Sequence, residues 1–356
     1  MDYLHIYDRL TGKRLAILEN AFDISYKLNL NPLSTASFSL PADDPKNQYC
    51  QPLNYVEVWD EGRRIDLFRI LPMELKKDVS TKAISYSCEQ VLATLLDDCL
   101  PRYHEMGGNT VTTAQSLRYV LDHQTVKRWE LLGCAFTSYF SYAVENENLL
   151  AAFESILSPL AADWMLVTDT SASPWTISVA PRPEKQAGEL RYGKNMNGIT
   201  KHTDPSDLAT RLYMYGYGEG DNQLGLEAVT DGKGYIESDT IERYGVISKI
   251  AVDRSIQDAD ILLSTAKALL AECSKPYLSY TVTAAAVSRN ERPLMPGDMV
   301  RVIDDEEGIS ELFPVISVEK RNVNGTWEVV YEIANKSQDL ASTLSGLSER
   351  QRISDL

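Results

Sequence analysis

The stretch LATRLYMYGYGEGDNQLG, residues 208–225, carries glycines at spacings that resemble a phosphate-binding loop. A dinucleotide-binding turn needs the spacing G-x-G-x-x-G between a strand and a helix, whereas Gly216, Gly218 and Gly220 give G-x-G-x-G with no amphipathic helix behind them. The chain also contains no G-x-x-x-x-G-K-[ST] motif. We therefore expect this stretch to bind no nucleotide.

Strict alternation is the more informative pattern in the same stretch. On a strand, Arg211, Tyr213 and Tyr215 point to one side, while Leu212 and Met214 point to the other. The glycines that follow allow the chain to turn. The stretch is therefore predicted to be a β-strand with one aromatic face that ends in a flexible loop.

Length and charge limit the possible classes of protein. The chain has 356 residues with 44% hydrophobic and 24% charged content, which is enough for two to four compact units. Its 35 basic and 51 acidic residues give a net charge of −16, and the basic ones are scattered. A protein that grips nucleic acid needs clustered Lys and Arg, so we exclude this class. A conduit past which DNA slides remains compatible with an acidic chain.

The chain shows no targeting or membrane-spanning segment. It begins MDYLHIYDRLTGKRL, without an apolar run and cleavage site, and no window approaches 18 uncharged apolar residues. We expect neither secretion by a signal peptide nor membrane insertion.

The five cysteines are far apart and form no C-x-x-C pair. They are predicted to be reduced thiols that are mostly buried. A catalytic role is the less favoured interpretation, and Cys88 in a strand-like segment is its best candidate. The cysteines are Cys50, Cys88, Cys99, Cys134 and Cys273.

Catalytic motifs are also missing. The segment HEMGG begins at His104 like a zinc-protease helix, but Gly108 stands where the second histidine is required. There is no G-x-S-x-G elbow, and the carboxylates from Asp304 to Glu307 fit a solvated turn. We expect no catalytic, cofactor-binding or metal-binding residues. Because none of the four histidines lie close together in the sequence, a three-histidine zinc site would arise only by an accident of folding. The four histidines are His5, His104, His123 and His202.

Two segments of different character make up the amino-terminal half. Residues 1–97 alternate apolar and polar positions between turn signals at 11–13 and 60–62, which predicts a small antiparallel barrel or sandwich. Residues 98–190 add a helix capped by Thr112, a second helix after Asn148 and a hairpin around residues 170–174. This second segment is predicted to be an α+β domain.

The carboxy-terminal half is predicted to be a β domain with an insertion. Residues 191–228 and 277–337 carry strand patterns. Between them, residues 229–276 contain a helix that begins near Asp258 and ends before Pro276. Residues 338–356 fit either a short helix or a tail.

Four segments in order resemble the prophage tail protein family, whose members are also called phage minor structural proteins or prophage endopeptidase tail proteins. Residues 1–97 are similar to the amino-terminal β domain of the same family, through ISYKLNLNPLSTASFSLPADDPKN and YVEVWDEGRRIDLFRI. The resemblance covers nearly the whole chain and is weakest in residues 98–145. The four segments are LRYGKNMNGITKHTDPSDLATRLYMYGYGEG, GYIESDTIERYGVISKI, SKPYLSYTV and PGDMVRVIDDE.

The resemblance implies a mainly β, α+β fold like that of contractile-phage hub proteins. Two tail-tube-like antiparallel β-barrels, the second discontinuous, would be joined by the α+β domain, with the small helix-containing domain inserted in the second barrel. Such hubs are homotrimers at the tail tip or baseplate of the virion, and the resemblance implies synthesis in the cytoplasm of a bacterial host. The ring would continue the tube, with a distal tail or tube protein on one side and a tip, spike or fibre protein on the other, and DNA would pass its pore without specific binding.

Two alternative functions remain open from the sequence. One is a tail-associated peptidoglycan hydrolase, because the family name includes an endopeptidase, although the chain stops about twenty residues after its last expected strand, so that a lytic domain is expected to be absent. The other is a host-surface carbohydrate-binding module, which the 19 tyrosines make conceivable. The family-motif positions are expected to be structural, in the core or at an interface of the second barrel. They are Thr210, Arg211, Leu212, Tyr213, Gly216, Gly297 and Asp298.

Overall fold

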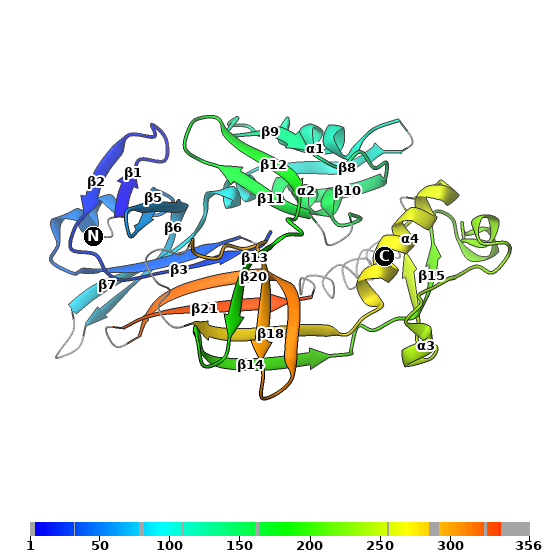
Figure 1. Cartoon of the computed structure of the whole chain (residues 1–356). Helices are drawn as coiled ribbons and strands as arrows, with labels where there is room; N and C mark the ends of the chain where they lie inside the picture. The colour runs from blue at the N-terminus through cyan, green and yellow to red at the C-terminus, as the bar shows by residue number, and fades with distance from the viewer. Residues whose placement is uncertain are drawn as a thin grey trace. The chain divides into compact units, whose positions relative to one another are not determined.

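Strands dominate the structure, a computed structural model in which helices are few (Figure 1). It describes residues 4–31, 33–77, 82–108, 110–160, 164–254, 256–284, 292–323 and 326–335. The predicted carboxy-terminal helix or tail, residues 338–356, lies outside the described residues. The predicted mainly β class is confirmed.

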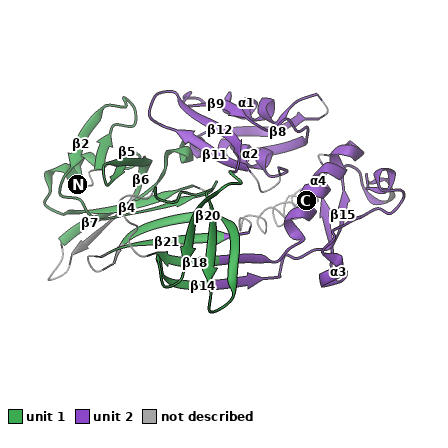
Figure 2. Cartoon of the chain, viewed as in Figure 1, with its two compact units in different colours: residues 1–94, 183–200, 280–333 green, residues 95–182, 201–279, 334–356 purple. Residues whose placement is uncertain are grey.

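The chain divides into two compact units, coloured separately in Figure 2. Unit 1 comprises residues 1–94, 183–200 and 280–333. Unit 2 comprises residues 95–182, 201–279 and 334–356. Each unit is thus built from segments that are far apart in the sequence.

Most strands of unit 1 belong to one 13-stranded sheet, whose order is β14-β18-β21-β20-β3-β4-β7-β6-β5-β1-β2, with β19 paired to β20 and β13 paired to β19. The amino-terminal strands are β1 (Leu4–Tyr7), β2 (Arg14–Leu18), β3 (Phe22–Asn29), β4 (Thr35–Pro41), β5 (Tyr55–Asp60), β6 (Arg63–Lys77) and β7 (Lys82–Gln90). The later strands are β13 (Gln186–Arg191), β14 (Met196–Asp204), β18 (Tyr277–Ala284), β19 (Met299–Asp304), β20 (Ile309–Val323) and β21 (Thr326–Ala334).

One antiparallel pairing joins the two ends of the chain in this sheet. Strand β20 pairs with β3, so that Val318 lies opposite Leu28 and Lys320 opposite Tyr26. The strands of residues 1–97 and of residues 277–337 therefore share a sheet. Among the described strands no closed barrel forms, and the two-barrel arrangement stays a prediction.

The core of the amino-terminal strands follows from their alternation. Leu4 and Ile6 on β1, and Val56 and Val58 on β5, are each at most 1% exposed and belong to one hydrophobic cluster with Phe68 of β6. The two turns predicted at residues 11–13 and 60–62 are present, because β1 pairs with β2 and β5 with β6 in antiparallel fashion.

Residues 98–182 of unit 2 form the expected mixture of helices and strands. Helix α1 begins with the predicted capping box, in which Thr112 accepts from the Gln115 backbone and the Gln115 side chain accepts from Thr112. Helix α2 is capped by Asn148. The elements are β8 (Cys99–Gly107), α1 (Thr113–Leu121), β9 (Trp129–Cys134), β10 (Ser141–Asn148), α2 (Leu149–Leu157), β11 (Trp164–Asp169) and β12 (Trp175–Pro181).

The remainder of unit 2 is a small sheet with a helix packed on it. The strand order is β16-β15-β17, and α4 contacts both β15 and β16. The helix begins near Asp258, as predicted, and the Asp258 side chain caps it by accepting from the backbone amides of Asp260 and Ile261. The elements are β15 (Arg211–Tyr215), β16 (Ile236–Glu237), α3 (Ile241–Tyr244), β17 (Ser248–Val252) and α4 (Ala259–Cys273).

This arrangement corrects one sequence-based expectation. Arg211–Tyr215 was expected in the second barrel, but β15 pairs with β16 and β17, which come from the predicted insertion 229–276. The physical reason is that β17 supplies a parallel partner over all five residues of β15, and α4 covers the apolar face. The predicted domain boundaries themselves stay a prediction.

None of the helices in the described ranges is both long enough and apolar enough to cross a membrane.

Candidate functional site

Thr210, the residue before β15, is hydrogen-bonded to the segment that leads into β17. Thr210 is fully buried, and its hydroxyl donates to the Gly245 carbonyl at 2.7 Å and accepts from the Ile247 amide at 2.8 Å. Its own amide donates to the Ile247 carbonyl at 2.8 Å. Thr210 therefore fixes where β17 begins, and every polar group of this residue is used for folding.

The two faces of β15 separate as the alternation predicts. Leu212 and Met214 are 2% and 1% exposed, on the strand that α4 packs against. Arg211 and Tyr213 are half-buried. The apolar face of this strand belongs to the core, and the aromatic face is the one that can meet a partner.

The aromatic face carries a small charged and aromatic group. The Arg211 guanidinium lies 4.3 Å from the centre of the Tyr235 ring and donates to Glu237 Oε1 from Nε at 2.9 Å and from Nη2 at 2.5 Å. The ring centres of Tyr213 and Tyr235 are 5.4 Å apart. The Arg211 guanidinium is paired with Glu237 and lies over the Tyr235 ring. Arg211 therefore holds β15 to β16 and offers no free cation for chemistry.

Gly216 is required by a close backbone approach. A Cβ atom at this position would lie 2.5 Å from the Ile256 carbonyl oxygen. The Gly216 amide donates to the Leu224 carbonyl at 2.8 Å, and the Leu224 amide donates to the Tyr217 carbonyl at 2.8 Å. The loop after β15 is therefore closed on itself by backbone hydrogen bonds.

The last two family-motif positions lie in unit 1, away in the sequence from the first five. The Gly297 amide donates to the Val315 carbonyl at 2.8 Å. Asp298 is 7% exposed and accepts from the Met295 amide at 2.9 Å and from Arg292 at 3.1 Å. Both residues close the turn that leads into β19.

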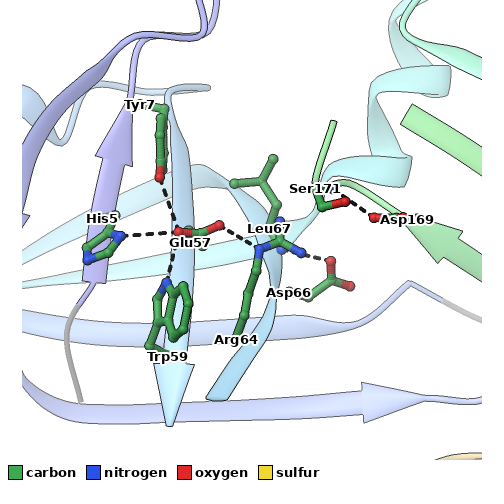
Figure 3. A network of polar contacts seen from close by, with 9 residues as sticks. All are labelled: His5, Tyr7, Glu57, Trp59, Arg64, Asp66, Leu67, Asp169 and Ser171. Atoms are coloured by element: carbon green, nitrogen blue, oxygen red, sulfur yellow. Dashed lines mark hydrogen bonds and ion pairs between the residues drawn. The ribbon is translucent and has the colours of Figure 1, made fainter. Parts of the chain in front are cut away.

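A half-buried polar network on β1, β5 and β6 was not predicted from the sequence (Figure 3). The Glu57 carboxylate accepts from Tyr7 Oη at 3.1 Å, Trp59 Nε1 at 2.8 Å and Arg64 Nε at 2.5 Å, and lies 3.2 Å from His5 Nδ1. Its side chain is 13% exposed. Alternation alone places His5 with Tyr7, and Glu57 with Trp59, on common faces, which is the only sequence signal for this network.

Burial and hydrogen bonding act in opposite directions on Glu57. Burial alone would raise the pKa of this carboxyl, but the hydrogen bonds from Arg64 and Trp59 outweigh it and hold the pKa below its ordinary value. The carboxylate thus stays charged and joins three strands. Because side chains of the protein itself occupy the acceptor positions of the Glu57 carboxylate, the network has a structural role.

The surroundings of Cys88 and His104, the two residues considered for catalysis, do not suit a catalytic role. Cys88 is 2% exposed, and burial raises the pKa of its thiol, so that it is protonated and shielded. His104 lies on the strand β8, where a helical zinc-protease motif cannot form. Cys50, Cys88 and Cys273 are buried, as predicted for most of the cysteines, whereas Cys134 is half-buried and Cys99 is exposed.

Other polar features are explained by local folding. Asp304 accepts from the Glu306 and Glu307 amides at 3.1 and 3.4 Å, in the turn predicted between β19 and β20. Within the described ranges, no group of three or more His, Cys, Asp or Glu residues lies close enough to hold a metal ion. A groove of about 790 Å³ beside β16 and α4 is lined by both lysines and carboxylates, among them Lys267 and Asp239, so it selects no single ligand charge.

The described residues form mainly strands, with few helices. Residues 184–344 match the model of the family described as prophage endopeptidase tail. The resemblance to prophage tail proteins inferred from the sequence is therefore confirmed. A comparison with curated proteins gives no match.

Solved structures of prophage tail proteins share this fold over almost the whole chain. The tail protein of Neisseria meningitidis is 16% identical with a TM-score of 0.67, covering 95% of this chain and 97% of its own. A prophage tail protein of Listeria monocytogenes is 15% identical with a TM-score of 0.64, covering 98% of both chains. A 43 kDa prophage tail protein of Shewanella oneidensis is 14% identical with a TM-score of 0.67, covering 93% and 97%.

Proposed function

We propose that this chain is the hub subunit of a phage tail tip or baseplate and assembles as a homotrimeric ring that continues the tail tube. The observation that carries the proposal is the fold shared with prophage tail proteins over 93–98% of the chain. A shared fold does not by itself define a role. The open sheet of unit 1 supplies the physical support.

The ends of that sheet are suited to assembly. Its strand order begins with β14 and ends with β2, each paired on one side among the described strands. Unpaired strand edges attract further strands, and a contact between different edges of neighbouring copies generates a ring when the rotation closes. In the proposed hub, these edges join neighbouring protomers, so that three copies close the ring.

The charge of the chain fits a passage for DNA. A net charge of −16 repels a polyanion, and the counterion release that drives DNA binding requires basic clusters. DNA therefore crosses the proposed ring without being held. A tube protein on one side and a tip, spike or fibre protein on the other complete the proposed assembly in the virion.

Light scattering coupled to size exclusion tests the ring. We expect a mass near three times 39.9 kDa, about 120 kDa, for the untagged chain. Leu15→Lys on the edge strand β2, where Leu15 is 37% exposed, should shift the mass toward the monomer. Leu10→Lys in the neighbouring turn, where Leu10 is 79% exposed, is the matched control and should leave the mass unchanged. A monomer at every concentration would contradict self-assembly of the ring.

The same sample also tests the alternative function, hydrolysis of peptidoglycan. We expect no release of soluble fragments from purified cell walls, because Cys88 is buried and protonated and His104 stands on a strand without a catalytic partner. Fragment release that is lost on Cys88→Ala or His104→Ala would overturn the structural role.

A further inference from the structure

Two of the four histidines meet on the surface of unit 2 beside a tyrosine. His104 belongs to β8, Tyr119 to α1, and His123 follows the end of α1. The ring centres of His104 and His123 are 5.6 Å apart, and Tyr119 lies 5.9 Å from the first and 4.6 Å from the second. Tyr119 is 39% exposed and His123 is exposed, so solvent reaches the cluster.

The hydrogen bonds of His104 define its tautomer. Nε2 lies 3.0 Å from the carbonyl oxygen of Pro101, which can only accept, so Nε2 carries the proton. In the neutral imidazole, Nδ1 is then a lone-pair acceptor, and the Tyr119 hydroxyl donates to it at 2.8 Å. The lone pair of His104 is therefore directed at the phenol oxygen of Tyr119.

His123 is fixed in the same way by a different carbonyl. Its Nδ1 donates to the backbone oxygen of Tyr119 at 2.8 Å, one helical turn earlier. Its Nε2 is left as the lone-pair nitrogen, and no residue of the described chain is bonded to it. Each ring thus has one N–H held by a backbone carbonyl and one lone-pair nitrogen, and the lone pair of His104 accepts from the Tyr119 hydroxyl.

This is the state in which histidine ligates metal ions, since the carbonyl bonded to the other ring nitrogen fixes the tautomer and orients the ring. Imidazole nitrogen binds zinc at about 2.0–2.1 Å, so two rings on one ion have centres within roughly 6.5 Å of each other. The observed 5.6 Å lies inside that limit. Imidazole favours Zn²⁺, Ni²⁺ and Cu²⁺ over the hard cations Mg²⁺ and Ca²⁺.

We propose that His104 Nδ1 and His123 Nε2 form a two-imidazole site for a divalent transition-metal ion. The Tyr119 hydroxyl bonds to Nδ1 in the metal-free chain and gives way when the ion binds. Because the described residues offer no third His, Cys, Asp or Glu ligand, water completes the coordination. The ion links β8 to the end of α1, which stabilises this part of unit 2. Because the chain supplies only two ligands, the bound ion exchanges with ions in solution.

Calorimetric titration of the untagged, metal-free chain with NiCl₂ tests the site. We expect one saturable ion per chain. His104→Gln and His123→Gln should each weaken the binding at least tenfold. His202→Gln is the matched control, because the His202 ring lies beside Tyr277 in another part of unit 2 and should leave the titration unchanged. An absence of saturable binding, or binding that persists in the double variant His104→Gln/His123→Gln, would overturn the proposal.

Two further measurements separate a metal site from a purely structural cluster. Tyr119→Phe removes the competing hydroxyl, so we expect binding of Ni²⁺ at least as tight as in the unaltered chain; tenfold weaker binding would contradict the assignment of Nδ1. In the unaltered chain, substoichiometric Cu²⁺ should broaden the imidazole signals of His104 and His123 in the nuclear magnetic resonance spectrum and spare those of His5 and His202. Uniform broadening would also contradict the site.

Discussion

Lys320 Nζ lies 2.6 and 2.7 Å from the two carboxylate oxygens of Asp60, joining residues that are 260 positions apart. The two side chains are 14% and 12% exposed. The Tyr26 hydroxyl donates to the same carboxylate at 2.8 Å, and the Trp327 ring centre is 5.3 Å from the ammonium. This ion pair fastens the β5–β6 hairpin to β20, close to where β20 pairs with β3.

Removing one partner of this pair should destabilise unit 1. Lys320→Met leaves the Asp60 carboxylate nearly buried without its cation, and a change of this kind costs about 3 kcal/mol or more. The double variant Asp60→Asn/Lys320→Met should lose less than the sum of the single variants, because neither charge is left alone. Calorimetric melting of the four proteins measures the coupling. Additive losses would show that the pair is not coupled.

Local features of the fold could be predicted from the sequence, and long-range ones could not. The Thr112 capping box and the Asp258 cap depend on residues within one turn of each helix, and both are present. The partner of β15 was not predicted, because β17 follows more than thirty residues later and leaves no local pattern in the strand. Alternation shows which face of a strand is buried and carries no information about which strand lies beside it.

The candidate sites follow the same division. The faces of β15 and the turn at Gly216 were predicted because they depend on neighbouring residues. The Glu57 network and the His104–His123 pair were missed, since β-strand pairing and the packing of α1 on β8 assemble them from distant segments. Spacing in the sequence gives no signal for such contacts.

Gly216 provides a test of the closed loop after β15. Gly216→Ala places a methyl group 2.5 Å from the Ile256 carbonyl oxygen, so the backbone must shift, and overpacking of this kind costs about 1–3 kcal/mol. Gly198→Ala in β14 is the matched control, because nothing lies within 4 Å of its added Cβ. Thermal unfolding should show a lower melting temperature for the first variant alone. Equal melting temperatures would contradict the close approach.

The Glu57 network predicts a dependence of stability on pH. Folding holds the pKa of Glu57 below its ordinary value of 4.5, so the ionised carboxylate stabilises the folded chain above about pH 4.5. This contribution is lost as the pH falls through the lower folded-state value. Glu57→Gln should therefore lower the melting temperature at pH 7 and differ less from the unaltered chain at pH 3. A difference that stays constant with pH would contradict the charged role of Glu57.

Thiol labelling tests where the cysteines lie. Burial raises the pKa of Cys50 to about 12, so at pH 8 only about one thiol in ten thousand is ionised there, and Cys88 is buried with a raised pKa as well. Cys99 is exposed and should react first. Cys134 is half-buried and its pKa is raised by burial, so it should react slowly.

Ellman's reagent at pH 8 measures these rates. Cys99→Ser should remove the fast phase, and unfolding in guanidinium should expose all five thiols. Rapid reaction of Cys88 in the folded chain would contradict its burial, and it would restore Cys88 as a candidate nucleophile, because only an accessible thiolate attacks a disulfide. If Cys88 reacts only after the chain unfolds, its thiol is a buried part of the core and has a structural role.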